Sequence, residues 1–226
     1  MTTPDPAESS TSLDRREFLK AETRERIVKA AIEILLAEGI SGFSMRKVAA
    51  KAGYTATAIY FHFPDKESLL GEVCAREFGA FRKSFERVGR VADPIERLVK
   101  MGKVFVEFAM EVPDHYRLMF LSQNFNLVKK EAFVERGNPA EDCYAFLKAT
   151  VADALAAGRF RPEFKDADEL CQIFFAAMHG LSALHIVKGE DPWVDWRPIR
   201  PTARKMIEAL IRGLTRDAED YSARGE

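Results

Sequence analysis

The chain has 226 residues, 47% of them hydrophobic, so it is long enough to bury a core without disulfide staples. Its net charge of −1 excludes a uniformly basic coat, and any contact with nucleic acid must come from a local patch. The three cysteines (Cys74, Cys143 and Cys171) are widely spaced and form no C-x-x-C pair, which argues against a zinc knuckle or a disulfide framework. We expect a reducing cytoplasm.

The amino-terminal stretch MTTPDPAESSTS is polar and lacks the basic and apolar regions of a signal peptide. No apolar run reaches the length of about 18 residues that a membrane span needs, so we expect no membrane segment. Residues 1–19, rich in Ser, Thr, Pro and acidic residues, are predicted to form a disordered tail. Arg15 and Arg16 near its end either touch a DNA backbone or stay solvated.

Apolar residues at helical spacing predict helices along the rest of the chain, and no strand pattern of period two is present. The fold class is therefore all-α, with about nine helices. A three-helix domain is predicted over 20–66 and a larger helical bundle over 67–220, with an irregular polar stretch at 123–138. The expected helices are 22–38, 45–52, 56–63, 66–89, 94–112, 113–122, 139–157, 166–187 and 201–216.

Two short helices around a glycine stand out near the amino terminus. Ser44 can cap the first helix, Gly53 allows a sharp turn, and Thr55 can cap the second helix. Ile59 and Phe63 are four residues apart and can pack on the first helix. Ala56, Thr57, Tyr60 and Phe61 then form a separate surface strip.

This order of helix, glycine turn and helix predicts a helix-turn-helix, whose second helix enters a DNA major groove. The alternative is an ordinary helical corner, which many all-helical proteins contain. Residues 52–55 (AGYT), residues 59–63 (IYFHF), Lys66-Glu67 and Leu69-Leu70 strongly resemble the DNA-binding domain of the tetracycline-repressor (TetR) family of bacterial transcription regulators. The resemblance covers residues 23–70.

The resemblance implies roles for individual residues. It implies that Arg46 reads bases from the first helix, and that Ala56, Thr57 and Ala58 meet base edges. Tyr60, His62 and Lys66 would contact or position the DNA backbone; the alternative for His62 is a neutral ring hydrogen-bonded between helices. The predicted DNA-binding set is Ser44, Arg46, Thr55, Ala56, Thr57, Tyr60, His62 and Lys66. No metal and no cofactor are expected.

The two carboxyl-terminal helices, 166–187 and 201–216, resemble the pair with which TetR-family subunits form a four-helix dimer interface. The stretch FFAAMHGLSALHI at 174–186 also resembles the helix that carries a His-Gly pair in one carboxyl-terminal subgroup, with Met178 where that subgroup often has tryptophan. The family implies a homodimer on a palindromic operator of double-stranded DNA, in the bacterial cytoplasm and on the nucleoid when bound.

A regulator needs an input, and the larger domain carries aromatic and sulfur-containing side chains on helices expected to face one another. Ligand cavities of helical bundles are mostly apolar with a few polar groups, so a lipophilic or aromatic effector is predicted. The alternative is that these side chains only fill the core. The candidate residues are Phe105, Phe108, His115, Met119, Phe120, Phe174, Met178 and His179.

Two other functions compete with a DNA-binding regulator. An enzyme is disfavoured because the sequence has no H-E-x-x-H, no glycine-rich phosphate loop and no G-x-S-x-G, and its four histidines lack metal-ligand spacing. A helical carrier of lipophilic molecules without a DNA role is the second rival. The intact Tyr60, His62 and Lys66 argue against that carrier.

Overall fold

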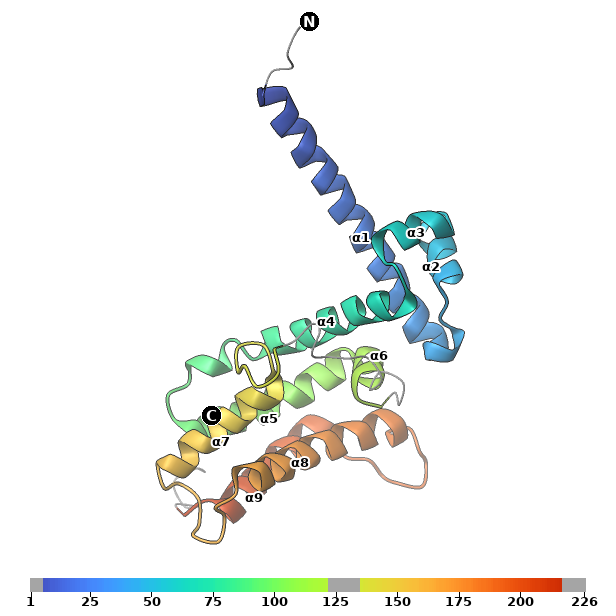
Figure 1. The fold of residues 1–226 in the computed structure, drawn as a ribbon. Helices are drawn as coiled ribbons and strands as arrows, with labels where there is room; N and C mark the ends of the chain where they lie inside the picture. Colours follow the sequence, from blue (N-terminus) through green and yellow to red (C-terminus); the bar gives the residue numbers. More distant parts are fainter. Residues whose placement is uncertain (1–5, 122–134, 217–226) are drawn as a thin grey trace, which may run out of the picture. The chain divides into compact units, whose positions relative to one another are not determined.

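The computed structural model describes residues 6–121 and 135–216, and the side chains of its first helix from residue 15 onward (Figure 1). Nine α-helices make up this part of the chain, which confirms the all-α class. They are α1 (Pro6–Gly42), α2 (Met45–Ala52), α3 (Ala56–His62), α4 (Lys66–Ser84), α5 (Pro94–Glu111), α6 (Pro113–Tyr116), α7 (Cys143–Ala156), α8 (Ala167–Lys188) and α9 (Ile199–Leu214). Short helical turns η1 (Val88–Arg90) and η2 (Arg117–Leu121) follow α4 and α6.

The chain forms two compact units, and the boundary between them falls inside α4, between Ala75 and Arg76. The sequence placed this boundary at residue 66, where α4 begins. Unit 1 contains α1, α2, α3 and the first part of α4, and unit 2 contains the remaining helices. Most of the irregular stretch expected at 123–138 lies outside the described residues.

The first helix is longer than the sequence predicted. A disordered tail was expected over 1–19, but α1 already begins at Pro6, and only residues 1–5 lie outside the described part. Proline is well accommodated in the first turn of a helix, and residues 13–22 (LDRREFLKAE) contain mostly good helix formers and no glycine. Local propensity therefore outweighs the polar composition. Phe18 and Leu19 stay 69% and 50% exposed on this extension.

Unit 1 is held together by the apolar faces of its first three helices. Ile27 and Val28 of α1, Val48 of α2 and Ile59 of α3 are completely buried, and Phe63 is 1% exposed. This confirms the packing that the spacing predicted. Gly39 ends the regular part of α1 with a left-handed φ of 65°, a conformation that glycine adopts without strain.

Unit 2 is built around α5, which packs on α7, α8 and α9. Its contact with α8 and α9 is close at Gly102, where an added Cβ would lie 2.9 Å from Ile207 Cδ1 and 3.0 Å from Met178 Sδ. α7 begins at Cys143 and not at Pro139 as predicted, because the Asp142 carboxylate accepts hydrogen bonds from the amides of the first turn. Helix starts depend on such acceptors.

Gly102→Val should destabilise the protein by about 1–3 kcal/mol, because the larger side chain overpacks the junction of α5, α8 and α9. Gly79→Ala is the matched control: Gly79 is exposed on α4, with nothing within 4 Å of an added Cβ. The control should stabilise by about 0.5–1 kcal/mol through helix propensity. Denaturant unfolding measures both, and equal stability of the two variants would contradict the close packing at Gly102.

Candidate nucleic-acid interface

The turn between α2 and α3 is fixed by two side-chain hydrogen bonds and by the left-handed conformation of Gly53. The Ser44 hydroxyl accepts a hydrogen bond from the Lys47 amide at 3.3 Å, and the Thr55 hydroxyl accepts one from the Ala58 amide at 3.2 Å. Gly53 between them has φ 78°, in the left-handed region. Ser44 and Thr55 are therefore the caps that the sequence predicted, and the glycine is required by the backbone.

Helix α3 presents one side to solvent and buries the other. Ile59 is completely buried and Phe63, just after the helix, is 1% exposed, whereas Tyr60 is 50% and Phe61 79% exposed. Thr57 is exposed as well. The predicted surface strip thus exists, and it carries methyl and aromatic groups that are free to meet a partner.

The cations of α2 differ in how they are engaged. Lys47 forms an ion pair with Glu38, and Lys51 lies 2.9 Å from a carboxylate oxygen of Glu33. Arg46 is exposed and has no ion-pair or hydrogen-bond partner within residues 6–121 and 135–216. Its guanidinium is therefore the uncommitted cation of this helix.

Lys66 and His62 are partly turned toward their own unit. The Lys66 ammonium lies 3.4 Å from the Phe43 carbonyl oxygen and 5.4 Å from the centre of the Phe43 ring. Nδ1 of His62 is buried without a hydrogen-bond partner in the described part of the chain. Burial and the nearby charges of Arg24 and Lys20 lower the pKa of His62 and favour its neutral form.

Two arginines that the sequence did not single out hold the motif in place from α1. Arg24 donates to the His62 carbonyl oxygen at 2.9 Å, pairs with Glu72 at 2.9 Å and lies over the Phe63 ring at 4.2 Å. Arg26 donates to the Ala52 carbonyl oxygen at 3.1 Å, at the end of α2. Most of these partners are distant in sequence, so no local pattern could reveal them.

Aromatic rings of unit 2 gather around Phe120 and His179. The Phe120 ring centre is 5.9 Å from that of Phe105 and 5.7 Å from that of His179. Phe175 stacks on His179 at 5.3 Å with an interplanar angle of 13°. The Tyr116 hydroxyl lies 2.6 Å from His179 Nδ1. Phe105, Phe120 and His179 were predicted as neighbours, whereas Tyr116 and Phe175 were missed.

The Tyr116–His179 pair is the polar element of this aromatic cluster. Burial raises the pKa of Tyr116 and lowers the pKa of His179, so both groups are neutral near pH 7. The tautomer of His179 sets the direction of this hydrogen bond, and the tyrosine hydroxyl also lies 3.4 Å from the His179 carbonyl oxygen, to which it can donate.

The remaining candidates for effector binding lie in other surroundings. His115 Nδ1 is 2.5 Å from the carboxylate of the buried Glu77, and Phe108 packs on Phe81 with ring centres 4.8 Å apart. The other three are buried in the core: Met119, Phe174 and Met178. Phe175 and His179 are four residues apart on α8, as are Phe174 and Met178. The sequence could not tell which pair faces the rings of α5 and η2.

No group of three or more His, Cys, Asp or Glu side chains that could hold a metal occurs in the described ranges. Helix α8 is long and apolar enough to cross a membrane, by length and composition alone. Within the described part of the chain, its apolar side chains Phe175, Leu184 and Val187 are 36%, 55% and 60% exposed.

Residues 27–73 match the family described as bacterial regulatory proteins, tetR family, and residues 98–210 match the tetracyclin repressor-like C-terminal domain. The chain is 44% identical over 54 residues to the transcriptional regulator SrpR of Pseudomonas putida, a match that spans 24% of this chain and 25% of SrpR.

Two solved structures share the fold. FadR of Bacillus subtilis, solved in complex with stearoyl-CoA, has a TM-score of 0.67 at 16% identity, covering 84% of this chain and 98% of FadR. NalD of Pseudomonas aeruginosa, a secondary repressor of the MexAB-OprM multidrug efflux pump, has a TM-score of 0.66 at 23% identity, covering 88% of this chain and 98% of NalD.

Lowering the pH should destabilise the protein through His62. Its pKa is lowered in the fold, so the unfolded chain binds more protons, and the free energy of unfolding falls as the pH drops through about 6.5, the usual histidine value. His62→Phe removes this titration and should give a smaller loss between pH 7.5 and pH 5.5 in urea titrations. His179, whose pKa is also lowered, leaves a residual slope. An unchanged slope would contradict the prediction.

Proposed function

The chain belongs to the TetR family of bacterial transcription regulators, and from that premise we propose that it is a repressor that binds a palindromic operator as a homodimer. A small lipophilic or aromatic effector releases the DNA. The observation that carries this proposal is the exposed strip of α3. This helix follows the left-handed turn at Gly53 and is held in place by the buried side chains of Ile59 and Phe63. As a member of this family the chain is a regulator and not an enzyme.

In this proposal α3 makes few direct hydrogen bonds to the bases. Ala56 and Thr57 offer mainly methyl groups, which suit contact with the thymine methyl, while the uncommitted Arg46 can pair with guanine O6 and N7. Tyr60, His62 and Lys66 contact or position the DNA backbone. DNA shape then carries much of the remaining specificity.

A two-fold operator requires a two-fold protein, and α8 with α9 offers the surface for it. The two helices lie side by side in unit 2 (Figure 1). Leu184 and Val187 of α8 are 55% and 60% exposed, although the helix is strongly apolar. We assign this surface, over about 166–187 and 201–216, to the same helices of a second copy, in a four-helix interface.

The effector in this proposal binds beside the aromatic cluster of unit 2. Phe81 of α4 contacts Phe105, Phe108 and Phe120, with ring centres 4.8–5.6 Å apart, so displaced rings would push directly on α4. Because α4 begins at Lys66 beside the recognition motif, its movement would change the spacing of two recognition helices, about 34 Å in the binding state. The effector acts only through its preference for the other state. A stearoyl-CoA complex of the similar FadR supports a lipophilic effector.

The protein would work in the bacterial cytoplasm, on the nucleoid while DNA is bound. Its rival is a carrier of lipophilic molecules without a DNA role. Gel shifts with genomic fragments, first the DNA upstream of its own gene, separate the two functions. A specific shift that an added effector abolishes supports the repressor, and no shift with any fragment favours the carrier.

Arg46→Ala should cost about 1–3 kcal/mol of discrimination at one operator base pair while general DNA affinity changes little. Lys66→Ala should weaken binding to all sequences and reduce the salt slope by about one. Arg87→Ala, an exposed cation between α4 and η1, is the control and should change neither. Binding titrations at several salt concentrations measure these effects. Equal loss on operator and random DNA for Arg46→Ala would contradict base reading.

Leu184→Glu should convert the dimer to a monomer, because it places a charge in the proposed apolar interface. Leu19→Glu is the matched control, since Leu19 is similarly exposed (50% against 55%) but lies on α1. Sedimentation velocity reads the oligomeric state of both variants. A Leu184→Glu variant that stays dimeric would rule out this interface.

A further inference from the structure

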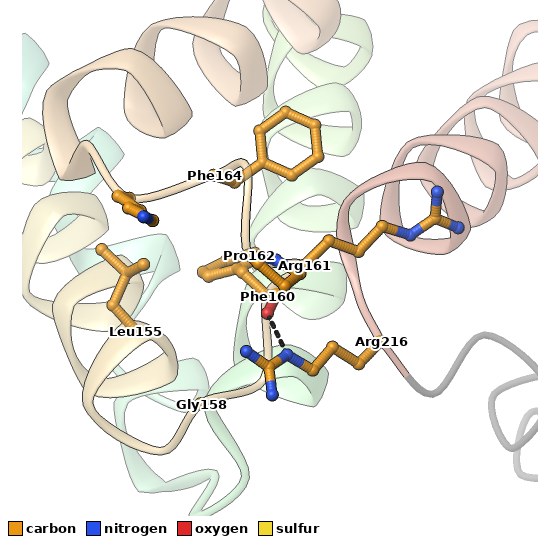
Figure 2. A pocket seen from close by; sticks show the side chains of 8 residues that line it. Leu155, Gly158, Phe160, Arg161, Pro162, Phe164 and Arg216 are labelled. Atoms are coloured by element: carbon orange, nitrogen blue, oxygen red, sulfur yellow. Dashed lines mark hydrogen bonds between the residues drawn. The ribbon is translucent and has the colours of Figure 1, made fainter.

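Unit 2 contains a hollow of about 370 Å³ that is separate from the aromatic cluster. It lies where the end of α7 and the connector from α7 to α8 meet Arg216, two residues beyond the end of α9 (Figure 2). Its volume falls within the range of sites for small organic ligands, about 300–1,000 Å³. Neither the family nor the proposed repressor function requires a site here.

The backbone around this hollow is pinned by a short antiparallel pairing of two segments. The Arg161 amide donates to the Leu214 carbonyl oxygen at 2.9 Å, and the Arg216 amide donates to the Arg159 carbonyl oxygen at 3.1 Å. Phe160 and Thr215 form the bridge between these bonds. The backbone at both arginines that line the hollow is therefore held in place.

Three cations line the hollow: Arg161, Lys165 and Arg216. Arg161 uses Nε and Nη2 on the carbonyl oxygens of Thr215 and Arg212, and Arg216 uses Nε on that of Phe160, the bond drawn in Figure 2. Nη1 of Arg161 and both terminal nitrogens of Arg216 have no partner in the part of the chain that the structure describes. Lys165 has no ion pair there either.

Among residues 6–121 and 135–216, no carboxylate lines the hollow to balance these charges. Three nearby aspartates serve other partners: Asp166 caps α8, Asp168 lies 2.7 Å from Lys148, and Asp93 lies 2.6 Å from Arg159. Glu163 of the connector is exposed and is not among the residues that line the hollow. Three like charges around one hollow repel each other, and a bound anion would relieve that repulsion.

The rest of the lining is mainly apolar: Leu155, Phe160, Pro162 and Phe164. Figure 2 shows these side chains together with Arg161 and Arg216 among the residues that line the hollow. We propose that this hollow binds a small amphipathic organic anion, with its acidic group on Arg216 and Lys165 and its apolar body against Leu155 and Phe164. Such a ligand would join the connector to the end of α9, in addition to any effector at the aromatic cluster.

An acidic segment follows the site in the sequence. Residues 217–226 follow Arg216 directly and contain four acidic residues and one arginine. The binding experiment therefore uses the full chain and, in parallel, a full-length variant in which Asp217, Glu219, Asp220 and Glu226 are replaced by Asn or Gln.

The test measures binding of 1-naphthoate and of its neutral isostere 1-naphthamide by isothermal titration calorimetry. Naphthoate should bind more tightly than the amide. Lys165→Gln should weaken naphthoate about tenfold, because a charge-assisted contact is lost, and leave the amide unchanged. Lys103→Gln removes the same charge from an exposed position of α5 and should change neither. Arg216→Gln should repeat the effect of Lys165→Gln.

Amide NMR spectra of the same samples locate the ligand. Shifts at Gly158 and Phe164 support the proposal, and tighter binding by the full-length variant without these four acidic side chains supports it as well. Equal affinity of the two ligands, no effect of Lys165→Gln, or shifts confined to Phe120 and His179 would overturn it. Because no DNA is present, failure here leaves the repressor proposal untouched.

Discussion

Burial of Ile59 and Phe63 against α1 and α2 is the interaction on which the exposed face of α3 depends. A helix of seven residues is not stable alone in water, so its position must come from packing and from its cap. The left-handed turn at Gly53 supplies the direction, and the Arg24 and Arg26 guanidinium groups hold the ends of α3 and α2 from α1. Thr57, Tyr60 and Phe61 are exposed as a consequence of that arrangement.

Many charged side chains of this protein are balanced locally, by ion pairs with neighbouring side chains. The net charge is only −1, yet individual cations differ sharply in availability. Lys47 and Lys51 are neutralised by glutamates of α1, which leaves Arg46 to meet a partner from α2. The hollow beside α9 follows the same logic, since no described carboxylate lines it while Asp166 caps α8 and Asp168 pairs with Lys148. Local pairing, and not net charge, therefore decides which of these cations are available to a partner.

The two units are built on different packing principles. Unit 1 uses aliphatic contacts and caps, which suit a small rigid body. Unit 2 links α4 to α5, η2 and α8 through ring-to-ring contacts such as Phe81–Phe105 and Phe120–His179, with the Tyr116–His179 hydrogen bond among them. Rings joined in this way can repack together, and this property suits a domain proposed to respond to a ligand.

The sequence by itself determined the helical class, the turn at Gly53, its caps Ser44 and Thr55 and the buried face of α3, because all of these depend on residues within a few positions of one another. It misjudged residues 6–19, where helix propensity outweighed polar composition. Only the tertiary structure decided which face of α8 meets the aromatic cluster, that His115 pairs with Glu77, that Arg24 clamps α3, and that three cations meet beside α9. These contacts join residues that are about 40 to 70 positions apart, and no local pattern encodes such a distance.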